Sequence, residues 1–594
     1  MTDFALAVPP EPLKSIADLD RVLTDSSGWA LRAGVAFGPG ALSEAGETSD
    51  CWATGCVRLD EKDLLRSRLG SVPTPARSDV DLVVAAYLRW GTACATHLMG
   101  DYAFALWDGQ RRRLLVARDS CGSVPLYYCE VDGHLVVSSD LRVLLRVRGV
   151  VWRANRSAIV DYIAELPMSE FETAFAQIRR IPPGHRLLWE DGEAHLQRHY
   201  LPRPRPTFSD KHECIHGFLG VLRKAVSARM PSGRSGVLLS GGLDSSLIAA
   251  LVAEMAPSKV VTFSGTFTTG VQWDEQVHQR AVVDHIGAEH YPVRIPDSSE
   301  GAGIEPALEL YGQPAPVGGH WMAWPLLAEA HRQGVDAVFT GLDGDRVVSH
   351  GHGRLQELAD QAAVAELLLE ACALRGLRGG LRVTLAKLVL GRLPRNAVRA
   401  WDRARAIRAF EKSATAAILR PPVLRDLDAA SRMASQHARP WSAEEDHQAG
   451  LERWDRALDL EVFAPLAQRH RVAACHPFFD RRVIEFCLAL PSDQKLRAGQ
   501  SRAVLRDASA GLIPDVVRQR RGKAAFDLPF ASWARESLGL LDKKAIDCSN
   551  LAPVADAAAI RDALSGRAPG VPVDLLWRCV VVSAWLRLHR LSLA

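Results

Sequence analysis

The stretch from Gly236 to Ser246, which reads GVLLSGGLDSS, constrains the fold more than any other part of this sequence. The apolar run 237–239 predicts a short buried strand, and apolar residues at helical spacing further on predict a helix that begins near Ser245. Between them lie a hydroxyl, two glycines and an acid. Glycines let the backbone approach a ligand closely, and a helix start directs free N–H groups toward it. The stretch therefore predicts a strand, a tight loop and a helix N-terminus that hold phosphate oxygens.

This loop is not the common phosphate loop, which needs a lysine directly after its last glycine. Leu243 and Asp244 stand at that place. The loop instead resembles the pyrophosphate loop of enzymes that split ATP into AMP and pyrophosphate. The resemblance implies contacts to ATP or pyrophosphate from Leu239, Ser240, Gly241, Gly242, Leu243, Asp244, Ser245 and Ser246, and also from Ser264 and Gly341. The carboxylate of Asp244 is expected to hold Mg²⁺ against the phosphates.

Length and composition bound the class of protein. The 594 residues are too many for one core, so two or more domains are expected. The net charge of +3 gives no general argument for nucleic-acid binding, and the eleven cysteines contain no C-x-x-C pair that would indicate a zinc site. We find no secretory signal and no apolar run of about 18 residues, so no membrane partner is expected. These features predict a soluble, cytoplasmic, globular protein.

Residues 1–200 form a predicted β-rich first domain, in which the short apolar runs 114–116 and 135–137 are separated by Asp-Gly turns. The Pro-rich stretch 201–210 is the expected linker. From 211 onward, helical patterns alternate with apolar strands at 260–264 and 337–340. This alternation predicts a doubly wound parallel sheet, in which ligands bind at the carboxyl ends of the strands.

A second glycine–acid loop, 341–346, follows the strand at 337–340. It contains Asp343 and Asp345. We expect Asp244 and Asp345 to face each other across one site and to share Mg²⁺ bound to ATP. Asp345 is thus a predicted metal ligand and catalytic residue, whereas Asp343 is either a further ligand or a turn residue.

Several further segments resemble the asparagine synthetase B family. Segments 57–65, 100–108, 117–128 and 181–185 resemble its N-terminal glutaminase domain, and 476–486 resembles the "Pro-Phe-Leu-Asp" segment of its synthetase domain. The resemblance implies an α/β protein with an Ntn-type αββα sandwich (1–200), followed by an adenylating pyrophosphate-loop domain with helical additions (211–594). It also implies a two-step ligase, in which a carboxylate attacks Mg-ATP and an amine then displaces AMP.

Two departures from the family pattern bear on the source of the amine. Working glutaminases of this family carry a cysteine nucleophile at position 2, where this chain has Thr2, and the first cysteine is Cys51. We expect a scaffold that no longer hydrolyses glutamine; the alternative is that Thr2 itself acts after Met removal. In addition, Leu342 occupies the place of a glutamate in asparagine synthetases and of a tyrosine in β-lactam synthetase.

Lys523 is the second predicted catalytic residue. In the family, a lysine three residues before the phenylalanine matched by Phe526 contacts the acyl-adenylate and pyrophosphate. A fixed cation there suits the charge that builds as pyrophosphate leaves. The alternative is a solvated basic turn, because Arg518, Arg520 and Arg521 lie just before it.

The helical region 355–460 is the least informative. Its segment 371–401 has no acids and seven basic residues: Arg375, Arg378, Arg382, Lys387, Arg392, Arg395 and Arg399. Either the segment is a solvated helical face, or it is a docking surface for an acidic peptide.

Lasso-peptide macrolactam cyclases share this architecture, an inactive glutaminase domain and a large helical insert. This resemblance implies that an Asp or Glu side chain of a peptide substrate is joined to the peptide's N-terminal amine. A leader-binding or protease protein is a further partner that the resemblance suggests. The alternatives are an asparagine synthetase-like ligase that uses ammonia, a β-lactam synthetase-like enzyme, and a non-catalytic ATP-binding paralogue.

Overall fold

A computed structural model describes most of the chain. The described residues are 5–8, 30–32, 35–37, 42–44, 51–70, 78–204, 208, 210–256, 258–267, 275–298, 303–315, 320–436, 439–453, 455–522, 527–541, 547–568 and 570–593. Thr2, Lys523 and part of the expected linker therefore lie outside the described residues. Within the described part of the chain, no helix has both the length and the apolar character needed to cross a membrane.

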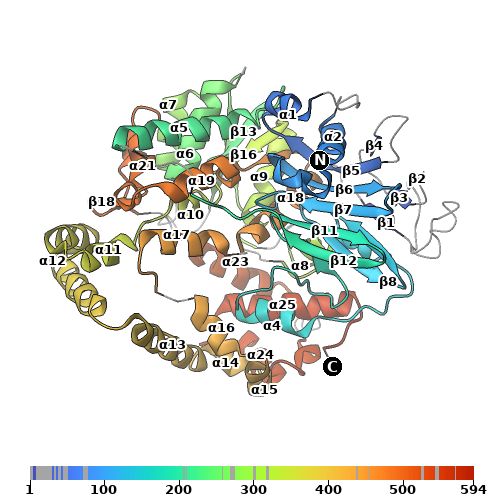
Figure 1. The fold of residues 1–594 in the computed structure, drawn as a ribbon. Helices are drawn as coiled ribbons and strands as arrows, with labels where there is room; N and C mark the ends of the chain where they lie inside the picture. The colour runs from blue at the N-terminus through green and yellow to red at the C-terminus, as the bar shows by residue number, and fades with distance from the viewer. Residues whose placement is uncertain are drawn as a thin grey trace.

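Two six-stranded sheets form the first part of the molecule (Figure 1). The first has the order β10-β8-β9-β1-β3-β2 and the second β12-β11-β7-β6-β5-β4, with every pairing antiparallel. The strands are β1 (Ala5–Val8), β2 (Ala30–Arg32), β3 (Val35–Phe37), β4 (Leu42–Glu44), β5 (Cys51–Leu59), β6 (Gly100–Asp108), β7 (Arg113–Arg118), β8 (Tyr127–Val131), β9 (His134–Ser138), β10 (Arg179–Arg180), β11 (His185–Glu190) and β12 (Glu193–Arg198).

Side chains that alternate along these strands build two cores. Tyr128 and Val137 pack between the two sheets, together with Trp107 from β6. Their neighbours Cys129 and Val136 face the other way, into a core shared with the C-terminal part of the chain. The run 135–137 lies in β9 of the first sheet and the run 114–116 in β7 of the second, and both sheets are buried on both faces, so the two runs are apolar throughout and indicate strands.

Helices cover both outer faces of this pair of sheets. The helices α1 (Lys62–Leu69) and α2 (Asp79–Trp90) pack on β5, β6 and β7, where Leu82 and Phe104 share one core. The helices α3 (Leu141–Leu144), α4 (Arg156–Ala164) and the C-terminal α25 (Val573–Leu588) lie against the other sheet. The predicted αββα sandwich is therefore confirmed, and one of its outer layers is completed by the last helix of the chain.

A five-stranded parallel sheet, β15-β14-β13-β16-β17, forms the second part of the molecule. Its strands are β13 (Ser235–Leu238), β14 (Val261–Thr266), β15 (Glu289–Arg294), β16 (Ala337–Phe339) and β17 (Ala473–Cys475). The predicted doubly wound parallel sheet is confirmed. The helix after β13 begins at Leu243, two residues before the predicted start, because Gly242 is extended and already serves as the N-cap. Asp244 therefore lies in the first helical turn.

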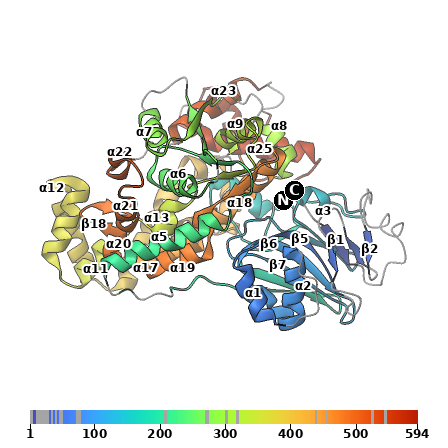
Figure 2. The same ribbon diagram turned by 90° about the horizontal axis from the view of Figure 1, so that it is seen from above.

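Helices lie on both sides of this sheet and at its edges (Figure 2). The helices of the second part outside the arm described below are α5 (Lys211–Ser227), α6 (Leu243–Met255), α7 (Gln276–Ile286), α8 (Ile304–Tyr311), α9 (His320–Arg332), α10 (Gly344–Val348), α19 (Arg481–Ala489), α20 (Ser492–Lys495), α21 (Ala503–Ala508), α22 (Asp515–Arg518), α23 (Asp527–Gly539) and α24 (Ala557–Leu564), with the small hairpin β18 (Leu496–Arg497) and β19 (Gln500–Ser501). Of these, α24 packs on α25 and not on the parallel sheet.

A helical arm extends from the second part, as expected for 355–460. In both ribbon views, α12 lies at the end of the molecule opposite the two antiparallel sheets (Figures 1 and 2). The helices of this region are α11 (Arg354–Asp360), α12 (Val364–Gly391), α13 (Arg395–Glu411), α14 (Ala414–Ile418), α15 (Pro421–Asp426), α16 (Ala429–Gln436), α17 (Ala443–Glu452) and α18 (Asp455–Arg469).

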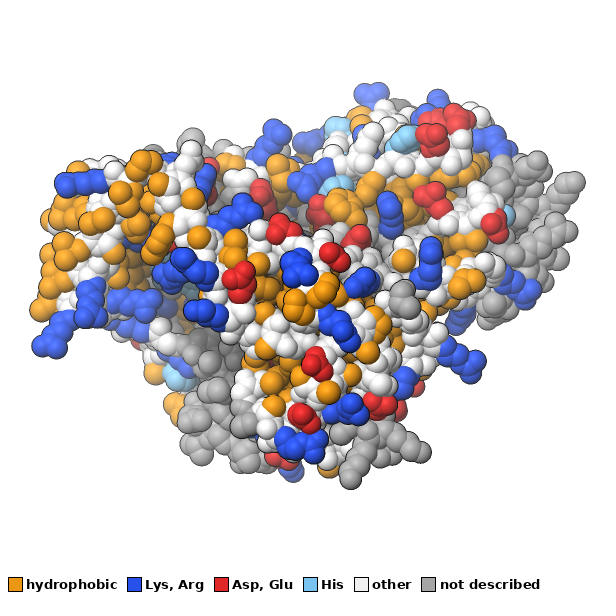
Figure 3. Space-filling model, turned by 90° about the horizontal axis from the view of Figure 1, so that it is seen from below, with side chains coloured by type: hydrophobic (Ala, Val, Ile, Leu, Met, Phe, Trp, Pro, Cys, Tyr) orange, Lys and Arg blue, Asp and Glu red, His pale blue; other side chains and the backbone are white. Residues whose placement is uncertain are grey.

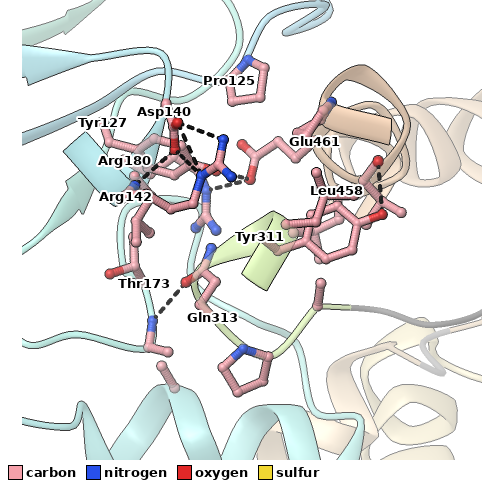
Figure 4. A pocket seen from close by; sticks show the side chains of 18 of the residues that line it. Pro125, Tyr127, Asp140, Arg142, Thr173, Arg180, Tyr311, Gln313, Leu458 and Glu461 are labelled. Carbon is pink, nitrogen blue, oxygen red and sulfur yellow. Dashed lines mark hydrogen bonds and ion pairs between the residues drawn. The ribbon is translucent and has the colours of Figure 1, made fainter. Parts of the chain in front are cut away.

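A buried charge cluster joins the two parts (Figure 4). Glu461, on α18, pairs with Arg118 and Arg180 of the sandwich at 3.0 Å each. The hydroxyl of Tyr127 donates to the same carboxylate at 3.2 Å. Glu461, Arg118 and Arg180 are all nearly inaccessible to solvent, so they hold the two parts in one fixed arrangement.

Candidate functional site

The loop after β13 is held in shape by its own hydroxyl groups. The Ser240 and Ser245 hydroxyl oxygens lie 2.9 Å apart, and the backbone N–H of Ser240 donates to Ser245 Oγ at 3.2 Å. The Ser246 hydroxyl donates to the Gly242 carbonyl at 2.7 Å. These contacts close the turn over the first turn of α6 and leave that turn at the carboxyl edge of the sheet, where free N–H groups attract anions.

Gly241 is required by both conformation and space. Its φ of +78° is a left-handed value that favours glycine. A Cβ there would also lie 3.1 Å from the backbone nitrogen of Gln279 on α7. The loop is therefore pressed between α6 and α7, and its shape depends on the absence of a side chain at this position.

The structure brings the second glycine–acid loop onto the first. Since β16 is the direct neighbour of β13, both loops leave the sheet at the same edge. A Cβ on Gly341 would lie 2.4 Å from the nitrogen of Ser245, and one on Gly344 would lie 2.8 Å from Cβ of Asp244. The two glycines thus allow the second loop to touch the start of α6.

Asp244 has two carboxylate oxygens in different surroundings. Its Oδ2 accepts a hydrogen bond from Arg502 at 2.5 Å, across 258 positions of the sequence. Its Oδ1 is buried and has no hydrogen-bond partner among the described residues. A buried carboxylate oxygen without a partner is costly unless a ligand supplies one. The residue therefore fits the predicted role of holding Mg²⁺.

Asp345 and Asp343 differ in their contacts, although both lie in the second loop. Asp345 lines the same cleft as Asp244. Asp343 instead takes a left-handed conformation and pairs with Arg456, and burial raises the pKa of its carboxyl. Of the two readings of Asp343, the ion-paired turn residue fits these contacts. The described residues contain no group of three or more metal-ligating side chains. Mg²⁺ often takes only one or two carboxylates beside phosphate oxygens, so Asp244 and Asp345 are the residues that would hold it.

The two loops open into a cleft of about 690 Å³. Most of the predicted residues line it: Leu239, Ser240, Gly242, Leu243, Asp244, Ser245, Gly341 and Asp345. Gly241 and Ser246 are not part of its lining. Ser264 is also outside it, because its buried hydroxyl donates to the Leu239 carbonyl at 2.6 Å and so ties β14 to the loop.

Arginines form the basic side of the cleft. Arg502 and Arg506 line it from the segment after β19, and Arg520 and Arg521 line it from the stretch just before Lys523. Arg520 is fixed by an ion pair of 2.8 Å to Glu275. The sequence does not single out Arg502, because its contact with Asp244 is long-range.

Asp459, on α18, is a cleft residue that the sequence reasoning missed. Burial raises the pKa of its carboxyl to about 7, an effect that Arg346 opposes and Asp343 reinforces. A carboxyl group with a pKa near neutrality can accept a proton at physiological pH. Asp459 is one of several charged residues on α18, in the region that is least informative, so no local pattern singled it out.

His350 and the apolar residues complete the lining. Burial and the nearby Arg502 lower the pKa of His350, so its ring is neutral at pH 7. The apolar residues include Phe263, Phe267, Met322, Leu326, Leu342 and Phe463. The cleft thus joins a polar, phosphate-sized end to an apolar wall.

The first part of the molecule contains no comparable thiol site among its described residues. Cys51, Cys56, Cys94, Cys121 and Cys129 are all buried. Burial raises the pKa of Cys94, Cys121 and Cys129 to about 12. A thiol nucleophile must be accessible to its substrate, and none of these five thiols is.

Comparison with protein families gives two matches along the chain. A model described as asparagine synthase matches residues 217–587, well over half of the chain, and one described as a glutamine amidotransferase domain matches residues 63–200. These matches agree with the two sheets of the first part and the parallel sheet of the second. The predicted order, an Ntn-type amidotransferase domain followed by an asparagine synthase domain, is confirmed.

Curated relatives are similar at moderate identity. An "Amidase chyE" of Penicillium rubens is 29% identical over 48% of this chain and 44% of its own length. A putative glutamine-hydrolysing asparagine synthetase of Mycobacterium tuberculosis is 31% identical over 39% of this chain and 36% of its own length. The asparagine synthetase 1 of Bacillus subtilis is 21% identical over 78% of this chain and 73% of its own length.

The alignments with the first two of these relatives thus span less than half of those proteins. The match to the family model is stronger evidence than these partial alignments, because it covers the loop at 239–246, the second loop at 341–346 and the arginines of the cleft in one continuous match. The architecture, the site and this match agree, and the chain belongs to the asparagine synthase family.

Proposed function

We propose that this chain is a carbon–nitrogen ligase that activates a carboxylate with ATP and joins it to an amine carried by the same substrate. In its specific form, the proposal is a peptide macrolactam cyclase of the lasso-peptide type. The observation that carries it is a contrast within one chain: the synthetase cleft has a buried Asp244 oxygen without a partner among the described residues, whereas the described thiols of the first part are buried.

In the first step, a carboxylate oxygen of the substrate attacks the α-phosphorus of ATP, and pyrophosphate leaves with the bonding electrons. The N–H groups at the start of α6 bind the pyrophosphate oxygens. Arg502 and Arg506 lie where they offset the charge, and Lys523 is expected to join them. Asp244 Oδ1 and Asp345 would hold Mg²⁺, which when bound neutralises phosphate charge.

In the second step, the amine nitrogen attacks the acyl carbon and AMP leaves with the bonding electrons. The nitrogen must lose a proton as the amide forms. Asp459 faces the same cleft, and its pKa of about 7 suits it to accept this proton. Asp459 is therefore proposed as the general base.

The apolar wall favours a bulky acyl group over free aspartate. Phe267, Met322 and Phe463 lie on this wall, and Leu342 occupies the second loop at the place of an acid in asparagine synthetases. An apolar wall contributes little to binding a small charged amino acid, whereas it can bury side chains of a peptide. It also excludes water, to which an acyl-adenylate is reactive.

Three alternatives remain distinct in what they predict. A ligase that uses ammonia would activate free aspartate. A β-lactam synthetase-like enzyme would close a small ring within one amino-acid derivative. A non-catalytic paralogue would bind ATP and Mg²⁺ at best, without exchange of pyrophosphate.

The deciding experiment is ATP–pyrophosphate exchange with purified protein and Mg²⁺. Offered L-aspartate alone, the protein should show no exchange above background, and exchange there would favour the ammonia ligase. Offered peptides with an internal Asp or Glu and a free N-terminus, it should show exchange and a product lighter by one water. Matched peptides with Asn or Gln at that position are the control, since they lack the carboxylate.

The wider organisation is part of the same proposal. We place an inactive amidotransferase-like domain at 1–200, a linker at 201–210 and the adenylating domain at 211–594. The expected partners are ATP, Mg²⁺ and a peptide substrate, with a leader-binding or protease partner and no nucleic acid or membrane. The expected compartment is the cytoplasm.

A further inference from the structure

We propose that the outer part of α12 is a docking track for an acidic, leucine-containing segment of the peptide substrate, outside the residues that are joined. This inference rests on the proposed function. We define the docking track as residues 377–393, which follow the break in α12 at Gly376, where φ is 72°.

An exposed apolar row runs along this track. Leu377, Leu381, Leu385 and Val389 follow one another at intervals of four on α12, so successive members are neighbours on the helix surface. Leu393 follows in the turn just after the helix ends at Gly391. Their exposed fractions are 71%, 45%, 63%, 59% and 47%. Single exposed apolar residues are common on protein surfaces, whereas a contiguous row marks an interaction site.

Basic side chains lie beside the row, and some of them have no acidic partner. Arg378, Arg382 and Arg392 form no ion pair within the part of the chain that the structure describes. Further along, Arg395 pairs with Asp360 at 3.5 Å and Arg399 with Glu445 at 3.1 Å. The arginines of the track therefore differ from those that brace α13. Their field favours an acidic partner and opposes pairing with a second copy of the same face.

The track is continuous with the rim of the cleft, which favours a substrate chain over a lipid surface. Leu374 of α12 lines the cleft, as does Gly499. The Glu370 carboxylate accepts hydrogen bonds from the N–H groups of Ala498 and Gly499 at 2.9 and 2.8 Å. These contacts fix the first part of α12 at the cleft, so the track begins within one helical turn of its mouth.

The surface view shows the same arrangement. At the end of the molecule that α12 occupies, on the left of Figure 3, hydrophobic side chains gather beside basic ones. The helical residues 377–391 extend over about 22 Å at 1.5 Å per residue, and Leu393 lies just beyond them. An extended peptide would need about eight residues to follow that length. The occupant is therefore a segment of at least this size that combines leucines with aspartates or glutamates.

The test measures binding of a defined probe to the full chain without ATP. The probe is a fluorescein-labelled peptide of about 16 residues with leucine and glutamate at i, i+4 spacing, and its partner carries lysine in place of glutamate. Fluorescence anisotropy should show at least tenfold tighter binding of the glutamate peptide. Leu381→Asn/Leu385→Asn and Arg378→Glu/Arg382→Glu should each weaken it at least tenfold, and the charge-reversed variant should gain affinity for the lysine peptide.

Matched controls are Leu588→Asn, whose side chain is 55% exposed on α25, and Arg567→Glu, an exposed arginine of another region. Equal binding of the two peptides, or weakening by the controls as strong as that by the track variants, would overturn the inference. Tighter, track-dependent binding of phosphatidylglycerol vesicles would also overturn it and assign the face to a lipid surface.

Failure of this inference and failure of the proposed function are distinguishable. Probe binding without pyrophosphate exchange on any peptide keeps the docking track and removes the cyclase. Exchange on a short peptide without probe binding keeps the cyclase and removes the docking track.

Discussion

The two parts of this molecule use similar loops in opposite ways. In the first part, Asp119 follows a strand and accepts hydrogen bonds from the N–H groups of Cys121, Gly122 and Ser123 at 2.8, 2.8 and 2.9 Å. Asp244, which follows a strand in the second part, keeps Oδ1 without a partner among the described residues. The carboxylate of Asp119 is used by hydrogen bonds within the fold, whereas the carboxylate of Asp244 has an oxygen that is available to a ligand.

This difference separates motifs retained for packing from motifs retained for chemistry. A buried polar atom without a partner costs about 1–3 kcal/mol, a cost that a ligand in the cleft would offset at Asp244 Oδ1. Arg118 and Asp119 belong to a segment that resembles the glutaminase domain, and their bonds are now to Glu461 and to local backbone. The first part therefore retains the family's architecture, and its described thiols are buried rather than reactive.

The largest expected effect concerns the packing role of the first part, and it is a loss of stability on removal of Arg118 from the buried charge cluster. Arg118→Met leaves Glu461 buried with one partner fewer, and such a loss costs about 3–5 kcal/mol of the free energy of unfolding. Urea denaturation followed by tryptophan fluorescence measures it. Arg223→Met is the control, because its pair with Glu254 is solvent-exposed and worth about 0–1 kcal/mol. Equal effects of the two variants would contradict the assigned role of the cluster.

The next prediction concerns the chemical role of Asp244 in the second part. Asp244→Asn removes the charge at the unpartnered oxygen and should slow ATP–pyrophosphate exchange by about 10²–10³-fold. Its apparent affinity for Mg²⁺ in the exchange assay should fall as well. Glu254→Gln is the control, since that exposed acid lies away from the cleft. An Asp244→Asn protein with normal exchange would show that the oxygen is not a ligand-binding atom.

Asp459→Asn separates the two chemical steps. Exchange should stay within a few-fold of the normal rate, while amide formation falls by about 10²-fold for loss of a general base. Because burial raises the pKa of Asp459 to about 7, the carboxyl is protonated below that pH and the rate of amide formation should rise as pH passes through 7. The variant should lose this rise. Equal losses in both steps would reassign Asp459 to binding.

Gly341→Ala tests the close approach of the two loops. The added Cβ would lie 2.4 Å from the nitrogen of Ser245, so one loop must move. We expect ATP to bind about tenfold more weakly, because the shift would misplace hydrogen bonds worth about 1.4 kcal/mol or more. Isothermal titration measures it. Gly450→Ala, whose Cβ would meet nothing within 4 Å, should bind ATP normally.

The smallest effect is expected at Thr2, the position of the family's nucleophile. Thr2→Ala should leave exchange and amide formation within twofold of normal, and neither protein should release ammonia from glutamine. Glutamine hydrolysis that Thr2→Ala abolishes would instead make Thr2 a working nucleophile and would remove the contrast between the two parts.

The sequence predicted the sheets well because their apolar runs are buried. The runs 237–239, 260–264 and 337–340 lie within one or two residues of β13, β14 and β16. The meeting of the two glycine–acid loops also followed from the rule for parallel sheets. The start of α6 was placed two residues late, since an extended glycine can serve as an N-cap without a side-chain signal.

The rest of the site depends on long-range contacts that no local pattern contains. Arg502 meets Asp244 across 258 positions, and the raised pKa of Asp459 comes from burial and from charges on other segments. Ser264 was expected at the nucleotide, but its hydroxyl is turned to the Leu239 carbonyl. Side-chain direction at a strand end cannot be read from the sequence alone. The role of Lys523 stays a prediction.

The helix α18 contacts the sandwich on one side and lines the cleft on the other. Glu461 faces the sandwich, and Asp459, two residues earlier, lies on the cleft; residues two apart on a helix point about 200° from each other. A rotation of α18 about its own axis would therefore move Asp459 away from the reacting atoms. The contact with the sandwich opposes that rotation, so the first part of the chain fixes the position of Asp459, the proposed proton acceptor.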